Sequence, residues 1–440
     1  MVRWFVAVYY PRIEVVHGEG ISQTKPVLLC ANHGNSLVDP VIIGIAARRP
    51  VRFMAKAPLF DHPILGPPMA ALGMVPAFRG SDDVKQVRRN LESLDIGAKV
   101  LVDGHAMGIF PEGKSTDQAH LEMIRSGAAR MAVQAVEEGA KELQVVPIGI
   151  TYERKDRFRT GVLVHVGEPI EVAELLRSHD GEQRKARRAL TAELESRLKE
   201  IVVHLDDPEW EPWLDDLEVL VPPVADVKAT PQRRIRQRKL IADAMNYFLE
   251  RDRPRAESVA AQIEAYRDGV RSAGLRVDSP VLLMGAWKVV SKLIGSLCLL
   301  LALLIPALLG TLHHLLPFVL VRKIASRMDH PGRLTIATHR LLVGVPFYLL
   351  WYAAVTVGVA LFSLKIALIW LAAAPLAGVI AWHYWRRAGR TLSLIYHQLR
   401  LIFARVQLQQ LRRQLGDLRR RLGELADEFT NLANAPPDSC

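Results

Sequence analysis

Residues 26–31, PVLLCA, are followed directly by the polar stretch NHGNSLVDP at 32–40 and the apolar run VIIGIAAR at 41–48. The aliphatic composition of the first stretch predicts a buried strand, and the apolar run predicts a helix. The Gly and Asn residues between them predict an irregular turn. Such a turn is a candidate functional position, because the functional residues of α/β proteins usually lie where strands end.

The same alternation of strand and helix continues from about residue 25 to residue 205. Further strands are predicted at 51–55, 73–77, 107–110, 143–150 and 162–170, and further helices at 84–102 and 121–139. Alternating strands and helices predict an α/β domain whose sheet is mixed or largely parallel and is flanked by helices.

The composition narrows the class of protein. The chain has 440 residues, which is long enough for more than one domain, and 50% of them are hydrophobic, which excludes a disordered chain. The formal net charge of +11 favours anionic partners, such as phospholipid surfaces, phosphorylated metabolites, acidic carrier proteins or nucleic acid. Three scattered cysteines fit neither a disulfide framework nor a zinc cluster, so we expect no metal site.

We divide the chain into five segments by composition. They are an interfacial N-terminal segment at 1–24, the α/β domain at 25–205, a helical connector at 206–280, membrane-embedded helices at 281–385 and a C-terminal amphipathic helix at 386–440. The connector carries basic clusters, with helical patterns at 235–251 and 255–273. Solvated or lipid-facing helix surfaces explain these clusters better than RNA binding does, so we expect no nucleic-acid partner.

Two long apolar regions predict a membrane protein. Residues 293–312 carry no charge over a length that suffices for one crossing, and residues 341–382 contain only Lys365 and fit two passes as a hairpin that turns near 363–365. Basic clusters follow each region, and both favour the cytoplasm.

This charge pattern predicts that 289–320 dips into the membrane and returns, with a break near Pro306 and Gly310. The α/β domain then lies on the cytoplasmic face. A single full crossing by this region is the alternative, and it would place the basic cluster between the two regions outside.

The last segment has apolar side chains at alternating steps of four and three. They are Leu411, Leu415, Leu418, Leu422, Leu425, Phe429 and Leu432. This spacing predicts a coiled-coil seam. The seam could pair with a second copy in a homodimer or pack against the connector helices of the same chain.

His33 and Asp39 are the first candidates for chemistry. They meet only if Gly34 and Asn35 form an irregular turn. Asp39 would then fix the imidazole tautomer and stabilise the imidazolium, which makes His33 a general base. The competing interpretation is that Asp39, before Pro40, caps the N-terminus of the following helix.

Two further polar segments follow predicted strands. Arg79 ends the run GMVPAFRG at 73–80, where a guanidinium suits a phosphate. Residues 110–116, FPEGKST, combine a tight turn with a carboxylate, an ammonium and two hydroxyls, which is typical of an anion-binding loop. The glycine spacing of a Walker or dinucleotide motif is missing, so nucleotide binding is disfavoured.

NHGNSLVDP, GMVPAFRG, FPEGKST and VVPIGI resemble, in order and approximate spacing, the four motif blocks of the phospholipid/glycerol acyltransferase family. The resemblance covers residues 10–205. It implies a glycerolipid acyltransferase-like fold and the transfer of a fatty acyl group from acyl-CoA or acyl carrier protein to a glycerol phosphate or lysophospholipid, with no cofactor.

The resemblance also implies roles for individual residues. His33 would deprotonate the acceptor hydroxyl, and Asp39 would orient His33. Acceptor binding would fall to Lys56, Arg79, Glu112, Gly113, Lys114 and Ser115, and acyl-chain binding to Val146, Pro147 and Ile148.

Two departures from the common motif pattern bear on the substrate. Five residues separate His33 from Asp39 instead of four, which resembles the yeast-type glycerol-3-phosphate and dihydroxyacetone-phosphate acyltransferases. Residues 114–116 read KST where the common block has Thr-Arg-Ser, so Lys114 or Lys56 would have to replace the missing Arg.

Acylation of glycerol 3-phosphate is therefore favoured. The alternatives are acylation of lysophosphatidate or another lysophospholipid, an inactive membrane scaffold, and a hydrolase using Ser36 or Ser115. Neither serine lies in a GxSxG motif.

Overall fold

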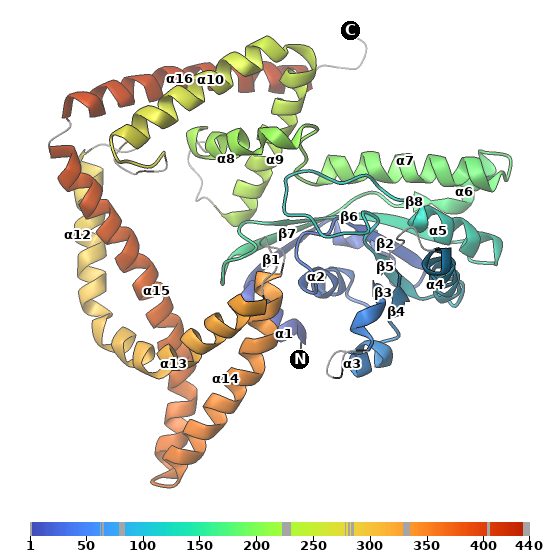
Figure 1. Ribbon diagram of the computed structural model, residues 1–440, viewed down its shortest axis with the longest axis horizontal. Helices are drawn as coiled ribbons and strands as arrows, with labels where there is room; N and C mark the ends of the chain where they lie inside the picture. The colour runs from blue at the N-terminus through green and yellow to red at the C-terminus, as the bar shows by residue number, and fades with distance from the viewer. Residues whose placement is uncertain are drawn as a thin grey trace. The chain divides into compact units, whose positions relative to one another are not determined.

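The computed structural model describes residues 2–61, 63, 66–78, 84–221, 230–277, 279, 282, 286–328, 335–402 and 405–433. These residues form two compact units (Figure 1). The first unit contains described residues of 1–208, 229–239 and 330–338, and the second contains those of 209–228, 240–329 and 339–440.

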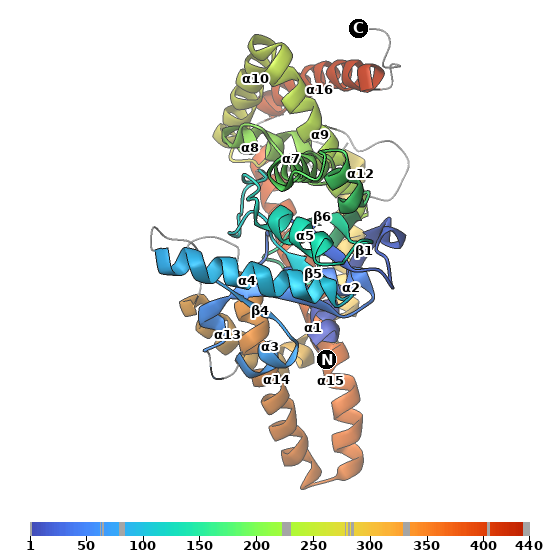
Figure 2. The same cartoon turned by 90° about the vertical axis from the view of Figure 1, so that its right-hand side faces the viewer.

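A mixed eight-stranded sheet lies at the centre of the first unit (Figures 1 and 2). Its strands are β1 Arg12–Val16, β2 Val27–Ala31, β3 Val51–Lys56, β4 Val75–Ala77, β5 Ala106–Ile109, β6 Gln144–Tyr152, β7 Gly161–Val166 and β8 Ile170–Glu171. Their order is β1-β7-β6-β2-β5-β3-β4, with β8 paired to the start of β6. β7 and β8 run antiparallel to β6, whereas the other pairs are parallel. The mixed α/β sheet predicted from the sequence is confirmed.

Helices flank this sheet. They are α1 Val2–Tyr9, α2 Val38–Ala47, α3 Gly66–Ala71, α4 Val84–Val102, α5 Gly127–Glu137, α6 Val172–Arg177 and α7 Gln183–Ile201. Leu28 and Cys30 of β2 pack in a core with α4, α5 and α7. The alternate β2 residues point to the opposite face. All of β2 is buried, as expected for a strand covered on both faces.

Two predicted elements have different bounds in the structure. The strand predicted at 162–170 is divided into β7 and β8. The helix predicted from residue 121 begins only at Gly127. The N–H groups of Leu121, Glu122 and Arg125 instead donate to the distant acceptors His204 Nδ1, Glu112 Oε2 and Pro111 O. Because these backbone groups are bonded to distant acceptors, residues 121–126 do not belong to the helix.

The parallel pairing places the carboxyl ends of β2, β3, β5 and β6 along one edge of the sheet. The turn with His33 follows β2, and the loop with Glu112 follows β5. Tyr152 is the last residue of β6. Residues from three distant parts of the sequence are thus brought to one edge, as is usual for α/β sheets.

The second unit is helical. Its elements are α8 Glu211–Leu220, α10 Arg253–Ser272, α12 Ala286–Ala302, α13 Leu304–Met328, α15 Leu364–Ile402 and α16 Arg405–Ala433, together with most of α9 Pro231–Arg251 and α14 Ile336–Ala360. α9 and α10 confirm the two helices predicted in the connector. α15 continues across residue 386, where the composition suggested a boundary.

Among the described residues, three helices are long and apolar enough to cross a membrane: α13, α14 and the part Leu364–Tyr396 of α15. α14 and α15 are joined by a short turn at 361–363, close to the turn predicted near 363–365. The predicted break within 289–320 is present, but it lies at Leu303, and α13 is continuous through Pro306 and Gly310. Pro306 lies in the first turn of α13, where a helix tolerates proline. The number of crossings and the cytoplasmic orientation stay predictions.

The leucine seam of α16 packs within the same chain. Leu411, Leu415, Leu418 and Leu422 are all buried. α16 packs against α10, with Arg255 and Glu428 forming a 2.9 Å ion pair between the two helices. Of the two partners considered for this seam, the structure shows the connector helices of the same chain. The homodimer stays a prediction.

Candidate active site

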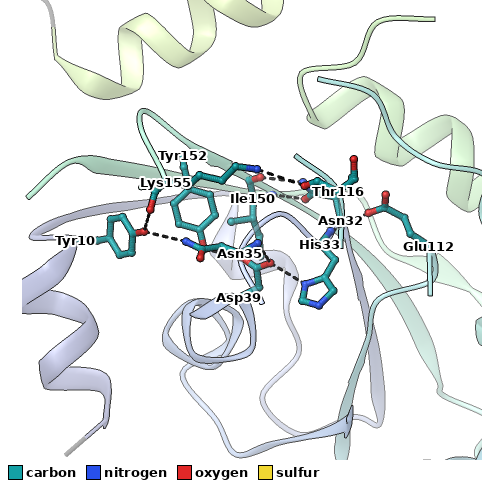
Figure 3. A network of polar contacts seen from close by, with 10 residues as sticks. All are labelled: Tyr10, Asn32, His33, Asn35, Asp39, Glu112, Thr116, Ile150, Tyr152 and Lys155. Carbon is teal, nitrogen blue, oxygen red and sulfur yellow. Dashed lines mark hydrogen bonds and ion pairs between the residues drawn. The ribbon is translucent and has the colours of Figure 1, made fainter. Parts of the chain in front are cut away.

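The turn after β2 brings His33 and Asp39 together. His33 Nδ1 lies 2.9 Å from Asp39 Oδ2 (Figure 3). Ser36, with φ 39°, adopts a left-handed conformation within this turn. The Asp39 side chain is fully buried, and that of His33 is 17% exposed. The competing interpretation is wrong, since the N-cap of α2 is Leu37 and Asp39 lies inside the helix.

Three donors hold the Asp39 carboxylate. Besides the imidazole, the backbone N–H of Asn35 donates to Oδ2 at 2.7 Å, and the Tyr152 hydroxyl donates to Oδ1 at 2.5 Å (Figure 3). Burial and the nearby Asp39 carboxylate raise the pKa of Tyr152 well above its ordinary value, so the phenol remains a donor. Hydrogen bonds to a carboxylate stabilise its charged form. The Asp39 carboxyl group is thereby held in place facing His33.

An outer layer of contacts supports this group. The Asn35 side chain donates from Nδ2 to the Tyr10 hydroxyl at 2.9 Å, and that hydroxyl donates to the backbone oxygen of Lys155 at 2.5 Å (Figure 3). Burial raises the pKa of Tyr10, which keeps it protonated. The chain just after α1 and the loop after β6 are therefore both tied to the turn that carries His33.

The loop after β5 fixes the position of His33 from the other side. Glu112 Oε1 accepts the backbone N–H of His33 at 2.8 Å, and the backbone oxygen of His33 accepts the N–H of Thr116 at 2.9 Å. The imidazole stacks on the Phe110 ring with centroids 4.0 Å apart. Its Nε2 forms no hydrogen bond with any residue that the structure describes. That nitrogen is therefore available to a substrate.

The surroundings of Glu112 suit a residue that holds two loops together better than one that binds a substrate. Its side chain is buried, and both of its oxygens accept backbone N–H groups, from His33 and from Glu122. Burial raises the pKa of Glu112 to about 7, against the opposing effect of these two hydrogen bonds. The carboxyl group joins the loops after β2 and β5.

The other acceptor-binding candidates have different surroundings. Gly113 has φ 72°, and Lys114 Nζ forms a 2.8 Å ion pair with Glu122. Ser115 follows them in the same loop. Lys56 is exposed at the end of β3, with no contact to His33 shown. Arg79 lies outside the residues that the structure describes.

The three acyl-binding candidates lie inside the sheet. Val146, Pro147 and Ile148 are in the middle of β6, paired with β2, and are buried. They line no exposed surface in this structure. Their contact with an acyl chain stays a prediction.

No group of three or more His, Cys, Asp or Glu side chains suited to hold a metal ion occurs in the described part of the chain. The polar groups of the site are His33, Asp39 and their hydrogen-bond partners. Sequence reasoning missed Tyr10 and Tyr152 as such partners. Tyr152 lies just after the fourth motif block, VVPIGI, but nothing in its spacing signals a contact with Asp39.

Comparison with known proteins gives a consistent result. Residues 12–151 match the family model described as Acyltransferase. The chain is 24% identical over 282 residues to glycerol-3-phosphate O-acyltransferase 1 of Saccharomyces cerevisiae, a match covering 58% of this chain and 36% of that protein. It is 27% identical over 262 residues to an uncharacterized acyltransferase of Schizosaccharomyces pombe, covering 56% of this chain and 38% of that protein. The chain thus spans less than two fifths of the length of these relatives.

One solved structure is also similar. It is the crystal structure of the 1-acyl-sn-glycerophosphate (LPA) acyltransferase PlsC from Thermotoga maritima, at 18% identity and a TM-score of 0.33, covering 44% of this chain and 75% of that one.

Residues 12–151 therefore form an Acyltransferase-family domain. The resemblance seen in the four motif blocks is confirmed. This range contains the His33–Asp39 pair and Glu112, and Tyr152 directly follows its end.

Proposed function

We propose that the chain is a membrane acyltransferase that transfers a fatty acyl group from a thioester donor to a hydroxyl of glycerol 3-phosphate. The 2.9 Å contact between His33 Nδ1 and Asp39 Oδ2, at the edge where the strands end, carries this proposal. The similarity to a yeast protein named glycerol-3-phosphate O-acyltransferase 1 supports the acceptor. The thioester is carried by coenzyme A or by acyl carrier protein.

The arrangement suits general-base catalysis. Asp39 accepts the proton on Nδ1, which leaves Nε2 of a neutral imidazole as the base. As Nε2 takes the proton of the acceptor hydroxyl, the acceptor oxygen bonds to the thioester carbonyl carbon. The tetrahedral intermediate then collapses, the carbon–sulfur bond breaks, and the thiolate takes the proton back from the imidazolium. The products are an ester and a free thiol, and His33 returns to its starting state.

The contacts around the pair serve this step. The imidazole gains a positive charge when it takes the proton, and the buried Asp39 carboxylate stabilises that charge. Tyr152 and the backbone of Asn35 hold the carboxylate in place. Phe110 fixes the plane of the imidazole ring by stacking on it. Such positioning keeps the base in a reactive geometry without further reorganisation.

The membrane-length helices fit the chemistry of the product. Acylation converts a water-soluble phosphate ester into an amphiphile, which partitions to a lipid surface. α13, α14 and the apolar part of α15 would hold the chain at that surface. Basic residues at the ends of these helices, such as Arg322, Lys323 and Arg387, would add attraction to anionic lipid.

Product analysis tests the proposal directly. The purified full chain in detergent is given acyl-CoA or acyl carrier protein with glycerol 3-phosphate, dihydroxyacetone phosphate, lysophosphatidate or glycerol, and the lipids formed are identified by mass spectrometry. We expect a monoacylated glycerol phosphate from glycerol 3-phosphate. Acylation of lysophosphatidate alone would replace the proposed acceptor. The absence of product from every acceptor would favour a scaffold that has lost the activity.

A further inference from the structure

An acceptor that carries a phosphate needs a cation near His33. The loop after β5 has Lys114, Ser115 and Thr116 where the common motif block has an arginine, and the sequence offered Lys114 or Lys56 as its replacement. Lys114 is already engaged, because its Nζ forms a 2.8 Å ion pair with Glu122. Glu112 is an anion-forming group and is fully occupied by backbone N–H donors.

Arg125 lies against this loop. A Cβ atom added to Gly113 would be 3.1 Å from Nε of Arg125 and 3.4 Å from its Cζ, so the arginine side chain crosses directly over the glycine. The backbone N–H of Arg125 donates to the oxygen of Pro111 at 3.0 Å, which fixes the start of the side chain. Gly113 has φ 72°, a conformation that favours glycine, and it leaves room for the guanidinium.

Arg125 is an exposed residue, and no partner of its guanidinium occurs in the described part of the chain. It forms no ion pair and no side-chain hydrogen bond with any described residue. The nearby carboxylates are committed elsewhere, Glu122 to Lys114 and Glu112 to two backbone N–H groups. An unpaired guanidinium offers a planar set of donors that matches a phosphate in a bidentate way.

Arg125 and His33 contact the same loop. Gly113 follows Glu112, whose carboxyl group accepts the N–H of His33, and Thr116 donates to the oxygen of His33. Arg125 and the imidazole are therefore both attached to the short loop 110–116. A glycerol phosphate with its hydroxyl at Nε2 of His33 would extend its phosphate along this loop.

We propose that Arg125 binds the phosphate of the acceptor, and so supplies the cation that the third motif block lacks. The ligand is a phosphate monoester of glycerol or of a similar small polyol. This inference rests on the proposed function, and it assigns the role to a residue outside all four motif blocks.

Kinetics of three variants test the assignment. Arg125→Ala should raise KM for glycerol 3-phosphate roughly ten-fold or more, as expected for one charge-assisted hydrogen bond, and leave KM for acyl-CoA unchanged. Arg125→Lys should recover part of the loss, because it keeps the charge but not the bidentate geometry. Arg184→Ala, at an exposed arginine of α7, is the matched control and should behave as the wild type.

A binding measurement separates this inference from the proposed function. Isothermal titration of glycerol 3-phosphate and of inorganic phosphate into the full-length His33→Ala protein reports binding without turnover. Addition of Arg125→Ala to that protein should weaken the binding of both ligands roughly ten-fold or more. Thermal unfolding of each variant checks that the fold is intact.

The outcomes are distinct. An active wild type whose KM and phosphate binding are insensitive to Arg125→Ala would overturn the inference and leave the proposed function standing. An effect confined to KM for acyl-CoA would also overturn it, since Arg125 would then contact the donor. Arg125-dependent binding of glycerol 3-phosphate by a protein that acylates no acceptor would support the inference while refuting the proposed function.

Discussion

The sheet of the first unit and the membrane-length helices of the second unit place their apolar side chains in opposite ways. Leu29 in β2 has no exposed surface, whereas Leu312 in α13 is 79% exposed. Both residues belong to uncharged apolar runs of the sequence. The difference shows that an apolar run in the sequence predicts only that its side chains avoid water. It does not predict whether protein or lipid surrounds them. Protein excludes the water around β2, and lipid is expected to do so around α13.

Polar groups differ between the two regions as well. At the edge of the sheet the polar groups converge. The carboxylate of the single residue Asp39 is contacted by His33, Asn35 and Tyr152. In the membrane-length helices the described polar contacts join pairs of helices instead, such as the 2.8 Å hydrogen bond between His314 of α13 and Tyr352 of α14. The polar groups of the first region therefore gather around one carboxylate, whereas those of the second region connect neighbouring helices.

The largest effect should come from the base itself. We expect His33→Ala to lower kcat by about 10² to 10⁴, because a positioned general base contributes that much to the rate. Acyl transfer to glycerol 3-phosphate, measured with saturating substrates, is the test. His105→Ala removes an exposed histidine that follows α4 and should retain wild-type activity. Retention of most activity by His33→Ala would refute the assignment of the base.

Truncation of one leucine in each region sharpens the comparison of burial. Leu29→Ala should destabilise the protein by about 2–5 kcal/mol, since it leaves a cavity in a close-packed core. Leu312→Ala should cost far less, because the side chain has few contacts with its own chain. Denaturant or thermal unfolding in the same detergent measures both. Equal losses would contradict the contrast between the two apolar surfaces.

Removal of one hydroxyl tests how far the site depends on the end of β6. Tyr152→Phe deletes the 2.5 Å hydrogen bond to Asp39, and we expect kcat to fall by about ten-fold or more, as for other hydrogen bonds to charged groups. Loss of this donor leaves one oxygen of Asp39 less firmly held, so the loss should appear in kcat rather than in KM.

A purely structural role for Tyr152 would lower the melting temperature without lowering kcat of the folded enzyme. Tyr247→Phe, which removes a hydroxyl in α9, is a matched control and should leave kcat unchanged.

The smallest effect is expected from the titration of Glu112. Its pKa of about 7 in the folded protein is above the ordinary value, so the folded state holds the proton more tightly than the unfolded chain does. The contribution of this group to stability is complete below its ordinary pKa and declines as the pH rises through about 7. Glu112→Gln should abolish this part of the decline in Tm between pH 5 and 8. An unchanged pH dependence would show that another group causes it.

The sequence predicted those features of the site that are local in the chain. His33 and Asp39 are six positions apart, and the strand before them and the helix after them are visible as apolar runs. The loop with Glu112 was found in the same way, from a turn after a buried strand. The hairpin of α14 and α15 also followed from length and charge alone.

Other features depend on residues that are distant in the chain. Tyr152 reaches Asp39 across 113 positions, and no spacing rule links a phenol to a carboxylate at that separation. Arg125 lies outside every motif block, within a stretch whose periodicity wrongly suggested a helix. The break before α13 lies at Leu303 for a local reason instead, because proline in the first turn of a helix loses no hydrogen bond.

The amino-acid sequence by itself determined the α/β class, the membrane-length helices and the His33–Asp39 pair that we propose as base and carboxylate. Strand order, the donors around Asp39 and the packing of Arg125 across Gly113 were decided only by the tertiary structure. The physical reason is that periodicity and turn chemistry act between neighbours in the chain. Hydrogen bonds and packing between distant segments exist only once the sheet has brought the ends of its strands to one edge.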